Sequence, residues 1–292
     1  MTGNAADMDA LLRASRVLGV NGWLDEAAVG VASGRVAWLG PAADAPPAKQ
    51  VVDLGDSLLA PGFVDLQVNG GGGVLFNHDR SVDALRCIAA AHRRFGTTAL
   101  LPTLISDTRL AMREAMEAAR RAVEEAVPGI IGLHLEGPYL AAERRGVHCA
   151  EHFHSPDNED IESLLAHALP HLLLTLAPEA VPLRAIRRLA DAGILLSMGH
   201  TAANFEQAEA AISAGVRGAT HLFNAMPPWT GRAPGALGAS LLSSEVWCGL
   251  IVDGHHLHPA SVKLAMRMKP GRCFLVTDAM SPVGSAQEAF DL

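Results

Sequence analysis

From Pro61 onward, short apolar runs alternate with Ala-rich amphipathic stretches, and this alternation constrains the fold more than any other feature of the sequence. The apolar runs have the length of buried strands, and the amphipathic stretches have helical periodicity. We expect strands at 63–68, 98–102, 131–135, 172–176, 194–198, 219–222, 248–252 and 273–276, and helices at 82–95, 108–125, 182–192, 205–214 and 259–268. Eight strand–helix units are what an α/β fold of the (β/α)8 TIM-barrel type requires. A doubly wound open sheet has the same alternation, but it gathers its ligands at one switch point.

The first 60 residues have a different texture, with short β-like segments and no helical pattern. Residues 28–31 and 36–39 predict a hairpin that turns at Ser33-Gly34. We expect residues 1–60 to form a small β module, with about the first nine residues disordered, and residues 61–292 to form the barrel. A module of this size is too short to close a hydrophobic core alone.

Composition excludes several classes of function. Hydrophobic residues make up 49% of the 292 residues, and the formal net charge is −8. The negative charge argues against a nucleic-acid partner. No apolar run reaches the roughly 20 residues that a transmembrane helix needs, and the N-terminus lacks the regions of a signal peptide. We therefore expect a cytoplasmic protein that does not contact membranes.

Three of the apolar runs end close to a residue that can bind a metal ion. Glu136 comes after the run that begins at residue 131, while His200 and His221 lie at the ends of two later runs. Taken singly, the acid is as consistent with a helix cap, and a lone histidine is usually a hydrogen-bonded core residue. Together they make up a known ligand set for catalytic zinc, in which water takes the fourth position. Barrel active sites lie at the carboxyl ends of the strands, so these residues predict a metal site there.

Five segments carry a resemblance to a known family. They are Pro61-Gly-Phe-Val-Asp-Leu-Gln-Val-Asn-Gly, Leu133-His-Leu-Glu-Gly-Pro, Ser197-Met-Gly-His-Thr, Thr220-His-Leu-Phe-Asn-Ala-Met-Pro and Val276-Thr-Asp-Ala. In this order the segments resemble the N-acetylglucosamine-6-phosphate deacetylases of the amidohydrolase superfamily. The opening Pro-Gly-Phe-x-Asp marks only the superfamily, whereas the second and fourth segments are much more specific.

The resemblance implies that Glu136, His200 and His221 hold the metal. Many superfamily members carry His-x-His on the first strand for a second metal, and the corresponding residues here are Asp65 and Gln67. A neutral amide is a poor ligand, so we expect one divalent ion per chain and a hydrogen-bonding role for Gln67. Zinc is the first candidate, although the same ligands accept iron, cobalt or manganese.

The resemblance also implies roles around the metal. Asp278 matches the catalytic acid–base and His148 matches a donor to the acetyl carbonyl. Arg232 matches a phosphate-binding residue that the family supplies from a second subunit, which implies a homodimer. The implied substrate-binding residues are Asn224, Ala225, Arg232 and His256. Without the resemblance, Asp278 is as consistent with a helix N-cap, and His148 and Arg232 are more typical of solvated loops.

These features predict a metal-dependent deacetylase that converts N-acetylglucosamine 6-phosphate to glucosamine 6-phosphate and acetate in amino-sugar catabolism. The alternatives are the same reaction on the galactosamine epimer, another N-acyl amidohydrolase, and a truncated, inactive remnant that binds sugar phosphates. Members of the family continue well past the matching aspartate, whereas this chain stops at Leu292. We therefore expect a barrel cut short after strand eight, an incomplete β module, and an aggregation-prone or weakly active protein when the chain is expressed alone.

Overall fold

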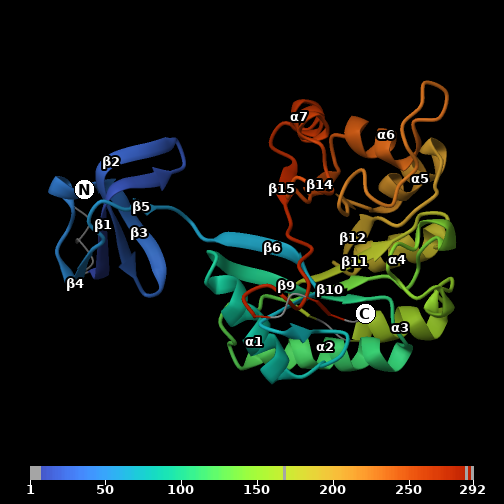
Figure 1. Ribbon diagram of the computed structural model, residues 1–292, viewed down its shortest axis with the longest axis horizontal. Helices are drawn as coiled ribbons and strands as arrows, with labels where there is room; N and C mark the ends of the chain where they lie inside the picture. Colours follow the sequence, from blue (N-terminus) through green and yellow to red (C-terminus); the bar gives the residue numbers. More distant parts are fainter. Residues whose placement is uncertain (1–7, 167–168, 287–288, 291–292) are drawn as a thin grey trace. The chain divides into compact units, whose positions relative to one another are not determined.

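The computed structural model describes residues 8–166, 169–286 and 289–290 (Figure 1). The chain forms two compact units, Met1–Gly62 and Phe63–Leu292. Most of the segment expected to be disordered lies outside the described residues. Met8 and Asp9 are described, and for these two the expectation was wrong, because both belong to the first strand. Met8 pairs with Ala48 of a neighbouring strand, and the Asp9 carboxylate accepts hydrogen bonds from the Ser33 backbone and the Lys49 side chain.

The first unit is a five-stranded sheet with the strand order β3-β2-β1-β4, in which β5 also pairs with β1. Its strands are β1 (Met8–Gly19), β2 (Gly22–Ala32), β3 (Arg35–Pro41), β4 (Ala48–Asp53) and β5 (Leu58–Leu59), with a 3-10 helix η1 (Ala42–Asp44) after β3. The predicted hairpin is confirmed as β2 and β3, which are antiparallel. Ser33 and Gly34 at the turn both have positive φ, as a tight hairpin turn requires. Sequence reasoning missed the long central strand β1.

The second unit is an eight-stranded parallel sheet that curves nearly into a closed barrel (Figure 1). In order, its strands are β6 (Phe63–Val68), β9 (Thr97–Ile105), β10 (Leu133–Glu136), β11 (Leu172–Leu176), β12 (Leu195–Met198), β13 (Gly218–Ala219), β14 (Trp247–Leu250) and β15 (Cys273–Leu275). A parallel bridge between Val68 and Ala279 joins the two ends of the sheet. The predicted fold class is therefore confirmed. A two-stranded ribbon, β7 (Gly70–Gly71) and β8 (Val74–Leu75), follows β6.

One predicted strand is much shorter than expected. The apolar run at 219–222 was expected to be extended throughout, but β13 ends at Ala219. His221 has a φ of 32°, in the left-handed region that a strand excludes. The chain therefore turns as it leaves β13, and this turn carries His221 over the end of the barrel.

Helices cover the barrel strands. They are α1 (Val82–Arg93), α2 (Arg109–Glu124), α3 (Asn158–Ala166), α4 (Leu183–Asp191), α5 (Phe205–Ala214), α6 (Gly235–Leu242) and α7 (Pro259–Met268), with 3-10 turns η2 (Ala142–Arg144) and η3 (Ala150–His152). The side chains of Ser81, Thr108 and Asn204 cap α1, α2 and α5 by accepting backbone N–H bonds. Sequence reasoning missed α3 and α6. Nearly all of α6 is buried, so the chain there lacks the polar stripe that marks a surface helix.

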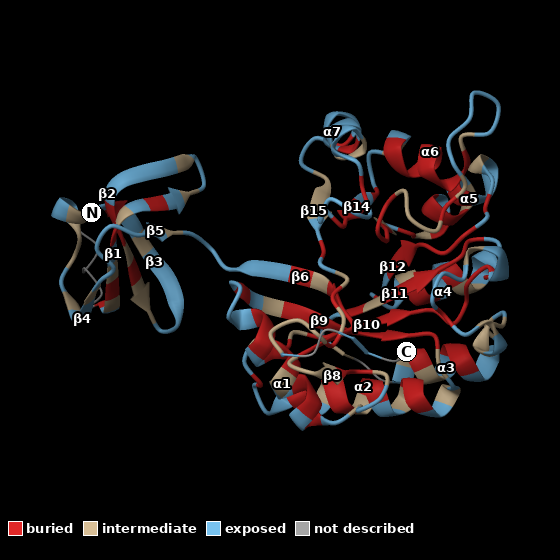
Figure 2. Ribbon diagram, viewed as in Figure 1, coloured by how far each residue is buried: buried red, intermediate tan, exposed pale blue. Residues whose placement is uncertain are grey.

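The core lies between the sheet and the inner faces of these helices, where buried residues concentrate (Figure 2). Its two largest side chains are Tyr139 and Phe76, and most of the rest are aliphatic, such as Leu100 and Leu133 on strands and Leu85 on helix α1. Across the described residues, no helix combines the length and the apolar character needed to cross a bilayer.

A candidate metal centre at the carboxyl ends of the barrel strands

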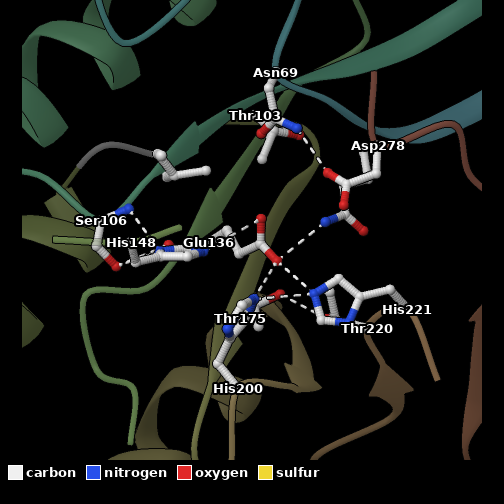
Figure 3. A network of polar contacts seen from close by, with 12 residues as sticks. Asn69, Thr103, Ser106, Glu136, His148, Thr175, His200, Thr220, His221 and Asp278 are labelled. Carbon is white, nitrogen blue, oxygen red and sulfur yellow. Dashed lines mark hydrogen bonds and ion pairs between the residues drawn. The ribbon is translucent and has the colours of Figure 1, made fainter. Parts of the chain in front are cut away.

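Three side chains from separate strands meet at one end of the barrel (Figure 3). Glu136 is the last residue of β10, and His200 and His221 follow β12 and β13. Glu136 Oε1 lies 3.2 Å from His200 Nε2 and 3.0 Å from His221 Nε2, and the two Nε2 atoms are 3.0 Å apart. All three side chains are buried. The structure therefore brings together the three residues predicted to bind metal.

The spacing of these atoms fits a tetrahedral metal ion. Ligand atoms about 2.0–2.1 Å from a tetrahedral zinc lie about 3.3 Å from one another. The three measured distances, 3.0 to 3.2 Å, are close to that value. Three ligands on one side leave the fourth position open, as in catalytic sites.

The protonation of His200 supports the same conclusion. Its Nδ1 lies 2.7 Å from the carbonyl oxygen of Arg144, which can only accept, so Nδ1 carries the proton. In the neutral ring, Nε2 then presents a lone pair towards the carboxylate oxygen of Glu136. Two lone pairs at this distance repel unless a cation lies between them. A histidine held by a backbone carbonyl in this way is typical of a metal ligand.

Burial and hydrogen bonding oppose each other at Glu136. Burial alone favours the protonated acid, but the two imidazoles of His200 and His221 beside it outweigh burial and hold the pKa of the carboxyl well below its usual value. Burial likewise opposes the charged form of His221, yet the bond to Glu136 raises the pKa of its imidazole. The amide nitrogen of Gln67 donates to the same Oε1 atom at 3.0 Å. The carboxylate is therefore ionised and available to a cation.

Strained backbone clusters around these ligands. Eight described residues other than glycine have positive φ, and five of them belong to the site or follow it directly: His200, His221, Phe223, Ala225 and Asp278. Each such residue costs of order 1–3 kcal/mol and persists only where the surrounding contacts fix it. The concentration of strain here is typical of a functional site.

A hydrogen-bonded layer lies beneath the ligands inside the barrel. His134, two residues before Glu136 on β10, contacts Thr103 through Nδ1 at 3.2 Å and Thr175 through Nε2 at 2.8 Å. The Thr220 hydroxyl continues the layer, at 2.7 Å from both Thr175 and Ser197. Every member is buried and partnered, so the layer fixes neighbouring strands directly below the site.

His148 reaches the cluster from the loop after β10. Its Nδ1 accepts a hydrogen bond from the Ser106 backbone N–H at 3.2 Å and lies 2.8 Å from the Ser106 hydroxyl. Burial lowers the pKa of the imidazole to about 4, so the ring is neutral. Because Nδ1 accepts from the Ser106 N–H, the proton of the neutral ring lies on Nε2. Nε2 lies 3.9 Å from Glu136 Oε2. The ligand atoms of Glu136, His148 and His200 all lie within 4.8 Å of one another, so distance alone also allows His148 to bind a metal.

Asp278 follows β15, on the side of the cluster opposite His148 (Figure 3). Burial and the nearby charge of Glu136 raise the pKa of its carboxyl. Its Oδ1 accepts a hydrogen bond of 2.7 Å from the side-chain amide of Asn69. A carboxyl with a raised pKa beside a metal site has the properties of a general base.

The other predicted residues lie around this cluster with fewer links to it. The Asn224 amide donates to the His221 carbonyl oxygen, and the Ala225 carbonyl accepts from the Thr201 backbone. Arg232 and His256 are exposed. Among the described residues, no hydrogen bond or ion pair joins either of these two side chains to the metal cluster, and their binding roles remain predictions.

Two residues that contact the site were given no role from the sequence. Asn69 lies in a segment that carries the family resemblance, and this was the only signal available for it. Ser106 follows the predicted strand at 98–102 with no motif around it. Their partners, Asp278 and His148, are 209 and 42 positions away, so only the fold connects the pairs.

Comparison with known proteins identifies the family of this chain. The model of the amidohydrolase family matches residues 58–281. N-acetylgalactosamine-6-phosphate deacetylase from Shewanella sp. (strain ANA-3) is 45% identical over 238 residues, which cover 81% of this chain and 60% of that relative. The chain thus spans less than two thirds of that relative's length.

Solved structures give the same family. The crystal structure of N-acetylglucosamine-6-phosphate deacetylase from Pasteurella multocida matches with a TM-score of 0.92 at 34% identity, over 97% of this chain and 75% of that one. A mutant of the Mycobacterium smegmatis enzyme in complex with N-acetyl-D-glucosamine-6-phosphate matches with a TM-score of 0.86 at 35% identity, over 96% of this chain and 73% of that one. The resemblance inferred from the sequence is confirmed, and the chain belongs to the amidohydrolase family.

Proposed function

We propose that the protein removes the acetyl group from N-acetylglucosamine 6-phosphate, giving glucosamine 6-phosphate and acetate. The observation that carries the proposal is the cluster formed by Glu136, His200 and His221, with an N–H donor and a carboxylate beside it. The names of the relatives supply the substrate class. Amino-sugar catabolism and a cytoplasmic location are part of the same proposal.

Glu136, His200 and His221 would hold one divalent ion, with zinc as the first candidate. When bound, such an ion acts as a Lewis acid and lowers the pKa of a bound water towards 7. The Gln67 amide keeps Glu136 oriented through its bond to Oε1. Many superfamily members bind a second ion through a His-x-His pair on the first strand, where this chain has Asp65 and Gln67. We therefore expect no second ion.

Asp278 and His148 would carry the proton transfers and the charge. Asp278 takes a proton from water while the water oxygen bonds to the acetyl carbon. His148 donates from Nε2 to the carbonyl oxygen as negative charge develops there. The carbon–nitrogen bond then breaks, and Asp278 returns its proton to the departing amine. Acetate and the free amino sugar leave, and Asp278 is again ionised.

Substrate binding is assigned to a second group of residues. We propose that Asn224, the Ala225 amide and His256 hold the sugar phosphate. Arg232, which is exposed, would reach the phosphate in the partner subunit of a homodimer. On a chain with a net charge of −8, a phosphate dianion needs a local cation of this kind. All of these residues belong to the proposed barrel domain, residues 61–292, and none to the module at 1–60.

The galactosamine epimer is a second candidate substrate. A relative that is 45% identical to this chain is named N-acetylgalactosamine-6-phosphate deacetylase. The two sugars differ at one hydroxyl, so one site can accept both with different kcat/KM.

The test is acetate release by purified protein from both epimers, with elemental analysis of the same sample. We expect about one ion per chain and a higher kcat/KM for one epimer. Hydrolysis of N-acyl amino acids but of neither sugar phosphate would assign the chain to another amidohydrolase. Metal-loaded protein that releases no acetate from any of these substrates would make it an inactive remnant.

A further inference from the structure

Asn69 and Asp278 lie where the two ends of the barrel sheet meet. The Asn69 backbone N–H donates to the carbonyl oxygen of Ala279 at 2.8 Å. The Asp278 backbone N–H donates to the carbonyl oxygen of Gln67 at 2.9 Å. Val68 and Ala279 form the parallel bridge between the same two segments. The backbone therefore holds both residues in register without help from the Asn69 side chain.

The side chains of the two residues form a short hydrogen bond inside this frame (Figure 3). Asn69 Nδ2 lies 2.7 Å from Asp278 Oδ1, and Asn69 is 1% exposed. An ionised carboxylate only accepts, so the amide must present its nitrogen to it. The remaining amide oxygen, Asn69 Oδ1, is buried without a hydrogen-bond partner among the described residues. An apolar side chain of the same size would avoid this unsatisfied acceptor, so stability alone does not explain an asparagine here.

We propose that Asn69 is a positioning residue that selects which oxygen of Asp278 exchanges the proton, an inference that rests on the proposed deacetylation. An amide neither gains nor loses a proton at neutral pH, so Oδ1 stays engaged as an acceptor throughout. The proton taken from water is therefore confined to Oδ2. The same oxygen then returns it to the amine, so Asp278 need not rotate between the two transfers.

The conformation of Asp278 makes such a constraint necessary. Its φ of 51° lies in the left-handed region, and the residue as a whole is partly buried. Its side chain has one described hydrogen-bond partner, the Asn69 amide. Without that bond, the carboxyl group is free to turn about its own axis and to present either oxygen.

The test uses Asn69→Leu, which keeps the side-chain volume and removes the amide. We expect kcat to fall about 10- to 100-fold, as for a misplaced catalytic group, with KM, metal content and melting temperature close to wild type. In an Asp278→Asn background, the same change should lower kcat no further, because the group it positions is gone.

Asn77→Leu is the matched control, since Asn77 is also bonded near a strand end. Its side chain contacts Ile105 and Asp107 and not the metal cluster, so melting temperature should fall while kcat stays unchanged. The inference is overturned if Asn69→Leu keeps the wild-type kcat, or if its loss multiplies with that of Asp278→Asn. Wild-type protein that releases no acetate would overturn the proposed function and this inference with it, whereas an active wild type with a normal Asn69→Leu variant overturns the inference alone.

Discussion

Replacing His148 with asparagine tests whether this side chain donates a hydrogen bond to the substrate or binds the metal itself. Its Nε2 atom lies 3.9 Å from Glu136 Oε2, and it falls within the group of ligand atoms that includes His200. Either role therefore fits the distances. The hydrogen bond that His148 Nδ1 makes with Ser106 distinguishes the two roles.

Binding a metal through Nε2 requires the neutral His148 ring to carry its proton on Nδ1. That nitrogen faces the Ser106 backbone N–H at 3.2 Å, and an N–H group can only donate. Moving the proton to Nδ1 would leave the buried Ser106 backbone N–H without its acceptor. Such a donor costs about 1–3 kcal/mol, which is roughly 5- to 140-fold in metal affinity through this nitrogen. We therefore expect His148 to act as a donor from Nε2.

The assay measures metal affinity by competition with a chelator and kcat by acetate release. For His148→Asn we expect unchanged metal affinity and a kcat lower by about 10²- to 10³-fold, as for the loss of one oxyanion donor. His154→Asn is the matched control, because His154 lies on the same loop and bonds Asp160 at 3.0 Å. A loss of metal affinity of about tenfold or more in His148→Asn, absent from the control, would make His148 a ligand and refute this reasoning.

Three further predictions concern the site, and one concerns the fold. His200→Asn should lose both the bound ion and activity, and two ions per fully active wild-type chain would contradict the single-metal site. Asp278→Asn should keep its metal while kcat falls on the order of 10²-fold or more, and a near wild-type kcat would leave Asp278 a structural role only. Mixing Arg232→Ala subunits with Asp278→Asn subunits should restore some acetate release, since some mixed dimers would hold one intact site; no recovery despite proven subunit exchange would exclude supply in trans. Burial opposes ionisation of Asp160, but its hydrogen bonds, above all the one from Arg109, lower the pKa of its carboxyl. The ionised carboxylate therefore stabilises the fold at neutral pH, and this stabilisation is lost as the pH falls below the ordinary pKa of an aspartate towards the lowered one. Asp160→Asn should therefore lower the melting temperature at pH 7, with a difference that narrows at acid pH; a difference independent of pH would refute the assignment.

Most of the barrel strands could be predicted because they are short apolar runs between polar turns, although β6 also contains Asp65 and Gln67. A parallel strand that is covered on both faces has this pattern, and all eight runs contribute to the sheet. Strand β1 lacks such a pattern, because its buried residues recur at every third position, Met8, Leu11, Ala14 and Val17, and exposed residues such as Arg13 and Arg16 lie between them. Helix α6 was not predicted because a helix that is buried on nearly every side has no amphipathic stripe. Periodicity therefore detects helices with one covered face and short strands that form apolar runs, and it misses a helix buried on nearly every side and a strand with another burial spacing.

The metal ligands could be located because barrel topology gathers the carboxyl end of every strand at one face. Glu136, His200 and His221 each need only lie at a strand end to meet there, and no knowledge of register is required. The contacts that decide chemistry depend on finer geometry. Ser106 determines which nitrogen of His148 carries the proton because its N–H lies 3.2 Å from Nδ1.

Asn69 shows the same limit more sharply. Its amide meets Asp278 only because the carbonyl of Gln67 accepts the Asp278 N–H, which fixes the register between segments more than two hundred residues apart. A shift of one residue between these segments would turn the Asn69 side chain away from Asp278. A single sequence contains the residue types for such a pair but not the register that joins them. The residues that hold and orient the reacting groups are therefore those that a structure can add, and they are where substitutions should affect kcat while leaving metal binding intact.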